Sequence, residues 1–207
     1  QPKAIDTLMV QSESFLGEYP NSEALTLNLL QVENVKSTIL YFPENINLKA
    51  TIYKDSIKSS FVKGGTQNDS YREFTDQLKR FNKIKSEKAQ LFKQARKEQD
   101  GILAQDLQQE ISDLAVQEND YKIDFVSKNP NSLFSVLLLT ELVSKKEISS
   151  ADATKIMNSY SPKIAATTSS KELRNTIAAM KKAEVGGLAP DFSAPTPAGK
   201  QLALSEV

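Results

Sequence analysis

The stretch KRFNKIKSEKAQLFKQARKEQDGILAQDLQQEISDLAVQEND, residues 79–120, decides the fold of this chain. Its first arm, residues 79–97, carries eight basic residues and one acid, whereas residues 98–120 carry seven acids and no base. Hydrophobic residues recur every three or four positions in both arms, which predicts two amphipathic helices. A break at Asp100-Gly101 separates the arms. We therefore expect a helical hairpin in which a basic helix lies antiparallel to an acidic one.

The helical period extends to both sides of this hairpin. Ser70 and Glu73 form a capping box, so we expect the first long helix to begin there. Asn129-Pro130-Asn131 ends the second, because proline disfavours helical geometry in the residue before it. A second capping box, Ser169 with Glu172, predicts a later helix start. The shorter helices that we expect lie at about 132–144, 150–160 and 170–184.

Residues 5–63 carry the period of two that is typical of half-buried strands. Short strands separated by turns predict an antiparallel sheet or a small sandwich. The expected fold class is therefore α+β, with this sheet followed by a helical bundle that contains the long hairpin. The expected strands are Leu25–Leu29, Ser37–Phe42, Leu48–Ile52 and Ser56–Val62, with a closing turn at Gly64-Gly65.

The expected domains follow from where the period changes. We expect a β-rich domain at residues 1–67, N-terminally incomplete, and a helical domain at residues 68–185. Residues 186–207 hold prolines and glycines at high density, so we expect a linker there and then the start of another domain.

The composition excludes several chemistries. The chain has no cysteine and no histidine, so it has no thiolate nucleophile, no disulfide, no imidazole base and no thiolate or imidazole metal ligand. Lys plus Arg equals Asp plus Glu at 26 each. The chain therefore has no net positive charge that would attract nucleic acid or an anionic membrane. The apolar run Leu133–Val143 is too short to span a bilayer. We expect no catalytic residue, no metal site and no cofactor in this chain.

Two charged patterns allow a functional and a structural interpretation. The basic arm at residues 79–97 could bind an anion or a nucleic acid, or it could be a solvated face that the acidic arm neutralises; we favour the second. Asp106, Glu110 and Asp113 have helical spacing, but a metal or acid–base site would need further partners, ideally a histidine. We therefore interpret these carboxylates as a solvent-facing row.

The tail carries the most specific motif. Residues 185–192 read VGGLAPDF and residues 198–207 read AGKQLALSEV. Together they resemble the opening of a thioredoxin-like domain of the AhpC/TSA, redoxin and TlpA type, which continues into its first core strand and reaches a Trp-Cys-x-x-Cys site. The resemblance gives the opening motif a structural role, in which it packs the chain start onto the thioredoxin-like sheet. The residues that match this motif are Gly186, Ala189, Pro190, Asp191, Phe192, Gly199 and Lys200.

A second resemblance covers most of the chain with more degenerate motifs. Several bacterial envelope proteins carry a β-rich domain of unknown function and a helical segment ahead of such a thioredoxin-like domain. This resemblance implies a periplasmic or cell-envelope location, with lipid anchoring upstream of residue 1 as one option. The segments that are similar to that group are Ile5-Asp6-Thr7, Pro20, Tyr41–Ile46, Phe61–Asn68 and Asn129–Ser132.

The two resemblances imply a non-catalytic accessory region of a thiol:disulfide oxidoreductase, whose cysteines would lie after Val207. Such a region would position the redox domain, dimerise it, or bind a substrate or partner, and the 207-residue chain itself would be inactive. Its partners would be proteins or its own thioredoxin-like domain, with a homodimer through the helical hairpin as a further option, and no nucleic acid. The alternatives are an envelope protein- or glycan-binding module without a redox role, and an accessory region of an AhpC/TSA-type peroxidase.

Overall fold

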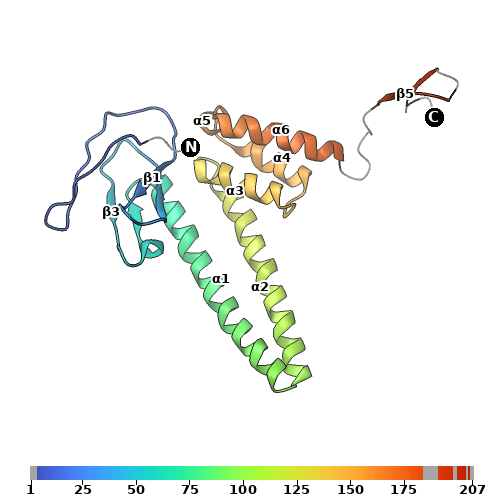
Figure 1. Ribbon diagram of the computed structural model, residues 1–207. Coiled ribbons are helices and arrows are strands. Elements are labelled where there is room, and N and C mark those ends of the chain that lie inside the picture. The colour runs from blue at the N-terminus through green and yellow to red at the C-terminus, as the bar shows by residue number, and fades with distance from the viewer. Residues whose placement is uncertain (1–3, 184–190, 198–199, 204, 206–207) are drawn as a thin grey trace. The chain divides into compact units, whose positions relative to one another are not determined.

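A computed structural model describes residues 4–183, 191–197, 200–203 and 205 (Figure 1). The chain divides into two compact units, Gln1–Gly65 and Thr66–Val207. The first unit holds short antiparallel strands, and the second holds mainly helices. The predicted α+β class is confirmed.

The strands of the first unit pair as two small antiparallel sheets of two strands each. Leu30 lies opposite Ile39 in one sheet, and Ala50 lies opposite Val62 in the other. The strands are shorter than the apolar alternation predicted, and the first begins three residues later than expected. They are β1 (Asn28–Gln31), β2 (Thr38–Tyr41), β3 (Lys49–Thr51) and β4 (Phe61–Lys63).

A small hydrophobic core holds these two sheets together. Ile39 of β2, Val62 of β4 and Ile57 of the connecting segment are each less than a tenth exposed. Burial of three such side chains supplies about 1.5–3 kcal/mol each. The half-buried side chains that pack around them are Leu30, Val32, Val35, Tyr41, Leu48, Ala50 and Ile52.

The strand predicted over Ser56–Val62 is wrong in its first half. Residues Ile57–Ser59 form a 3₁₀ turn, η1, and β4 begins only at Phe61. The Ser60 hydroxyl oxygen accepts a hydrogen bond from the Tyr53 N–H at 2.8 Å. Because serine side chains offer the backbone local hydrogen bonds, they favour a turn over a sheet ladder here.

The first part of this unit, residues 4–27, forms one isolated bridge between Gln11 and Ser14. Ser12 and Glu13 between them have φ of 47° and 61°. Two successive positive φ values are the geometry of a tight hairpin turn. The flanking residues do not extend this bridge into strands, so the strand character expected from residue 5 onward is realised only from Asn28.

The turn predicted at Gly64-Gly65 is confirmed. Both residues have positive φ, 100° and 77°, which glycine adopts without a steric penalty. A Cβ on Gly65 would in addition overlap the carboxylate of Glu44. The positive φ therefore favours glycine at Gly65, whereas the Glu44 carboxylate ends a flexible side chain that can move aside.

Two long helices of the second unit form the expected antiparallel hairpin (Figure 1). Its turn is at Asp100, whose side chain accepts a hydrogen bond from the Leu103 N–H at 3.0 Å. Gln99 before it has a φ of 60°, the left-handed geometry that ends many helices. The helices of this unit are α1 (Thr66–Lys97), α2 (Gly101–Lys128), α3 (Leu133–Ser144), α4 (Ser150–Ser159), α5 (Pro162–Ala165) and α6 (Thr168–Ala183).

Both predicted capping boxes are wrong in position. Helix α1 begins four residues before Ser70, whose hydroxyl instead donates to the Gln67 carbonyl at 3.2 Å. Helix α6 is capped by Thr167, whose hydroxyl oxygen accepts from the Ser170 N–H at 3.3 Å, so Ser169 lies inside the helix. The short helix α5 was not expected, although Pro162 in its first turn is a standard start signal.

An aromatic cluster fills the space where α1, α2 and α3 meet. The ring of Phe74 lies 4.8 Å from that of Phe125, 4.9 Å from Phe134 and 5.6 Å from Tyr121, measured between centroids. Phe74 itself is 3% exposed. Among the other apolar side chains of the helical unit, several are at most 1% exposed, including Val126, Val136, Leu139, Leu142, Ala153, Ile164 and Leu173.

Candidate functional site

The described part of the tail forms a small antiparallel β-hairpin. Strands β5 (Ser193–Pro195) and β6 (Gln201–Ala203) pair so that Ala194 lies opposite Leu202. Next to the turn, the Thr196 N–H donates a hydrogen bond to the Lys200 carbonyl at 2.7 Å. The tail is therefore an ordered β-hairpin in its described part rather than an irregular linker.

A carboxylate closes the other end of this hairpin. Asp191 accepts hydrogen bonds from the N–H of Ser205 at 3.0 Å and from its hydroxyl at 2.9 Å. Bonds to a charged acceptor are stronger than neutral ones, so this pair holds together two residues that are fourteen positions apart. The hydrogen bonds between Asp191 and Ser205 thus hold the two ends of the β-hairpin together.

One face of the hairpin is apolar and open. Phe192 precedes Ala194 by two positions and so shares its face, as does Leu202 opposite. Phe192 is 63% exposed and Leu202 is 41% exposed. Of the motif residues predicted from the sequence, Asp191 and Phe192 lie just before β5, and Lys200 lies just before β6. Gly186, Ala189, Pro190 and Gly199 lie outside the described residues.

The hairpin of α1 and α2 carries ion pairs along its inner seam. Glu118 on α2 contacts Lys85 on α1 and also Lys122 one turn away, the latter at 2.8 Å. Lys88 on α1 contacts Glu110 on α2 in the same way. The predicted antiparallel pairing of a basic and an acidic helix is therefore realised by direct contacts between the two arms.

Glu118 stands out among these carboxylates because its side chain is only 13% exposed. Burial alone would raise its pKa, but hydrogen bonds and charges from Lys122 and Lys85 together hold the pKa below its ordinary value. Glu118 therefore stays ionised at neutral pH. An ionised carboxylate between two ammonium groups stabilises the helix pair and is poorly suited to abstract or donate a proton.

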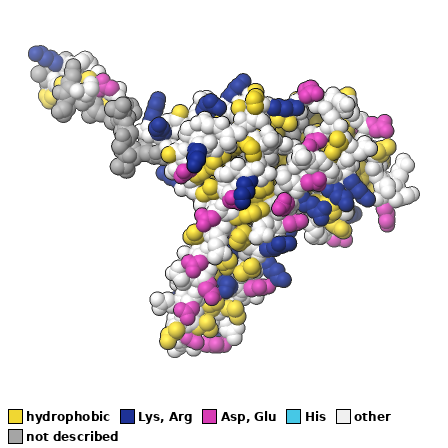
Figure 2. Space-filling model, turned by 180° about the vertical axis from the view of Figure 1, so that it is seen from behind, with side chains coloured by type: hydrophobic (Ala, Val, Ile, Leu, Met, Phe, Trp, Pro, Cys, Tyr) yellow, Lys and Arg dark blue, Asp and Glu magenta, His cyan; other side chains and the backbone are white. Residues whose placement is uncertain are grey.

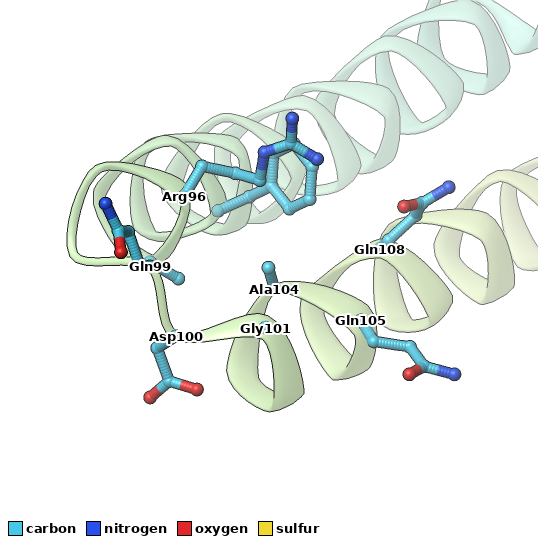
Figure 3. Close-up of a pocket in the computed structure, with 9 residues that line it drawn as sticks. Arg96, Gln99, Asp100, Gly101, Ala104, Gln105 and Gln108 are labelled. Atoms are coloured by element: carbon cyan, nitrogen blue, oxygen red, sulfur yellow. The ribbon is translucent and has the colours of Figure 1, made fainter.

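A shallow cavity of about 350 Å³ lies beside the tip of the hairpin (Figure 3). Ala95 and Ala104, both buried, form its floor and let the two helices approach closely. The Arg96 guanidinium lies 6.0 Å from the centroid of the Phe92 ring, at the rim. The other lining residues are Gln99, Asp100, Gly101, Gln105 and Gln108. This polar rim brings together no nucleophile with a base, so it offers binding groups without a catalytic pair.

The acidic row does not converge on one point. Glu110 pairs with Lys88, and Asp113 accepts from the Gln109 amide at 2.8 Å. Among the described residues no group of three or more acidic side chains is arranged to hold a metal ion. Within the same residues no helix is long and apolar enough to cross a membrane.

Two buried polar groups were not singled out from the sequence. The Gln67 side chain accepts from the Leu133 N–H at 2.8 Å and donates to the Asn131 carbonyl at 2.6 Å, so it ties the start of α1 to the start of α3. The Tyr160 hydroxyl donates to the Ser135 carbonyl at 3.1 Å, and burial raises its pKa. Both groups stabilise the packing of the helical unit. For the Gln67 contacts, the one nearby sequence signal was the helix end predicted at Asn129–Asn131.

Comparison with known proteins found no protein-family model, no curated protein and no solved structure that matches this chain.

Proposed function

We propose that this chain is the non-catalytic accessory region of a thioredoxin-like thiol:disulfide oxidoreductase of the bacterial cell envelope. The observation that carries the proposal is the β5–β6 hairpin. Strand β6, which lies within the second stretch that resembles the family's opening motif, pairs with Ser193–Pro195, and Asp191 of the first stretch accepts hydrogen bonds from Ser205. The exposed apolar face with Phe192 and Leu202 supports the proposal further, because a domain that begins with this hairpin would cover it.

The absence of cysteine limits the part that this chain can play in a thiol:disulfide exchange. A thiol:disulfide exchange needs a thiolate that attacks a disulfide sulfur and releases a second thiolate. The 207 residues contain no cysteine, so the attacking sulfur must come from outside them. The roles that we propose for this chain are to position the redox domain, to bring two copies together through the helical hairpin, or to hold a protein substrate.

The residues encoded after Val207 provide the sharpest test. We expect a Trp-Cys-x-x-Cys sequence within the following forty or so residues, as the resemblance of the tail implies. The chain extended to include it should catalyse the reduction of insulin by a dithiol, and the 207-residue chain should not. A continuation without cysteine, or turnover by the 207-residue chain alone, would contradict the proposal.

The same experiment separates the alternatives. A single cysteine in a Pro-x-x-x-Thr-x-x-Cys context, with turnover of hydroperoxide in place of insulin, would assign the region to a peroxidase of the AhpC/TSA type. A stop codon soon after Val207 would favour a protein- or glycan-binding module without a redox role. The proposed envelope location predicts an export signal upstream of Gln1, and a cytoplasmic start without one would contradict it.

A further inference from the structure

Helix α6 has one buried face and one charged face. Leu173 and Ile177 are 1% and 4% exposed, and together with the buried Ser170 they form the face that packs into the helical unit. The basic side chains of the helix are all exposed, and they are Lys171, Arg174, Lys181 and Lys182. Figure 2 shows Lys and Arg side chains along the upper edge of the helical unit, where α6 lies in Figure 1.

The four bases share one side of the helix, which we call the α6 basic face. At 3.6 residues per turn they fall within an arc of about 100° and extend about 16 Å along the helix axis. Ala178 lies in the middle of this arc, and its small side chain leaves the face open to a flat surface. Glu172, the one acid in Thr168–Ala183, lies about 80° outside the arc.

The α6 basic face is not neutralised within the described part of the chain. On the helical hairpin, Lys85 and Lys88 of α1 contact carboxylates of α2. Among the described residues, no ion pair involves any of the four bases of α6. Residues 150–183 carry a net charge of +4 (six bases minus two acids), whereas the whole chain is neutral. The positive charge of this face is therefore local.

This pattern of charge favours anionic lipid as the partner. A cluster of about four to eight Lys and Arg on an amphipathic helix binds anionic lipid headgroups, which a membrane presents as a flat layer. Proteins that bind single-stranded nucleic acid add aromatic side chains on which the bases stack. Helix α6 contains no Phe, Tyr or Trp, so it offers charge without a stacking platform.

We propose that the α6 basic face docks the helical unit on a membrane surface through anionic lipid headgroups. The inference names a partner for the accessory region, and it rests on the envelope location in the proposed function. Each base strengthens vesicle binding about fivefold, so four together supply on the order of several hundred-fold. Failure of vesicle binding would overturn this inference alone, because it does not depend on the residues encoded after Val207.

A charge-matched pair of variants tests the face. The α6 variant carries Lys171→Gln, Arg174→Gln, Lys181→Gln and Lys182→Gln. The α1 variant removes the same charge from exposed positions of α1, and it carries Lys79→Gln, Lys83→Gln, Lys93→Gln and Lys97→Gln. Because glutamine is a good helix former, both variants should keep the helical circular dichroism of the wild type.

Co-sedimentation with lipid vesicles measures the binding of the 207-residue chain. At low salt, the wild type and the α1 variant should bind vesicles of equal parts phosphatidylcholine and phosphatidylglycerol, and neither should bind phosphatidylcholine alone. The α6 variant should bind the mixed vesicles on the order of several hundred-fold more weakly. Molar salt should release the wild type, because the screening length falls to about 3 Å. A wild type that does not bind the mixed vesicles, or equal loss in both variants, would overturn the proposal.

A competition experiment separates lipid from nucleic acid. The wild type is bound to the mixed vesicles, and a single-stranded oligonucleotide is added at the same concentration of phosphate as the anionic lipid. We expect the chain to stay on the vesicles, because α6 has no aromatic side chain to stack on the bases. Release of the chain by the oligonucleotide would assign the face to nucleic acid and would refute the lipid proposal.

Discussion

The ion pairs around Glu118 allow a quantitative test of how the hairpin is held together. Glu118→Gln keeps the shape of the side chain and removes its charge, which leaves Lys85 and Lys122 beside each other without a carboxylate. The side chains of Glu118 and Lys122 are each 13% exposed, and that of Lys85 is 29% exposed. Removing one partner costs about 3–5 kcal/mol for a buried pair and about 0–1 kcal/mol for an exposed one. We expect about 2 kcal/mol for this half-buried triad.

Glu110→Gln is the matched control, because it removes the other carboxylate that bridges the two helices. Glu110 is 51% exposed, so solvent screens its contact with Lys88, and we expect a loss of about 0.5 kcal/mol. Urea unfolding followed by helical circular dichroism measures both values. If Glu118→Gln loses no more free energy of unfolding than Glu110→Gln, the buried triad does not stabilise the hairpin and the reasoning fails.

The pH dependence of this stabilisation has a definite sign. The folded pKa of Glu118 lies below that of an unfolded glutamate, about 4.3. Its contribution is therefore fully present above the unfolded pKa, and it is lost as the pH falls through the lower folded pKa. The difference in unfolding free energy between the wild type and Glu118→Gln should accordingly shrink on acidification below about pH 4. A difference that grows in acid would contradict the assignment.

Three further substitutions probe the packing. Gly65→Ala should cost about 1 kcal/mol in urea unfolding, because an alanine would be strained at a φ of 77°; Gly101→Ala, which has no positive φ and nothing nearby, is the control. Gln67→Ala should cost about 1–3 kcal/mol, because it leaves the Leu133 N–H unpaired in a buried site, and loss equal to that of the exposed Gln94→Ala would contradict this. Phe74→Ala should cost about 3–5 kcal/mol and change the near-ultraviolet circular dichroism of the aromatic cluster, and a loss under about 1 kcal/mol would show that the cluster is not the core.

The helical hairpin could be predicted from the sequence because its determinants are local. Hydrophobic spacing defines each helix, Asp100-Gly101 marks the turn, and opposite charges define the pairing. The start of α1 could not be predicted in the same way. Helix α1 continues back past Ser70 to Thr66, and there the Gln67 side chain bonds to Asn131 and Leu133, more than sixty residues away. A non-local hydrogen bond of this kind leaves no periodic signal.

The candidate site shows the same contrast. The resemblance of the tail to an opening motif stays a prediction from its residue types, whereas the hydrogen bonds between Asp191 and Ser205 depend on the register of β5 and β6. The cavity at the hairpin tip was not anticipated, because Ala95 and Ala104 line it only once the two helices are aligned. Small residues in a helix carry no functional signal until their partner helix is known.

The inner seam of the helical hairpin combines ion pairs with apolar contacts. Positions on the seam that a helix pair normally fills with apolar side chains hold Lys85 and Glu118 instead, so the seam buries less apolar surface than its length allows. The ion pairs of Glu118 therefore carry a larger share of the helix pairing than they would in an apolar seam. Glu118→Gln consequently tests the hairpin more sharply than truncation of an exposed apolar side chain such as Leu103, which is 44% exposed.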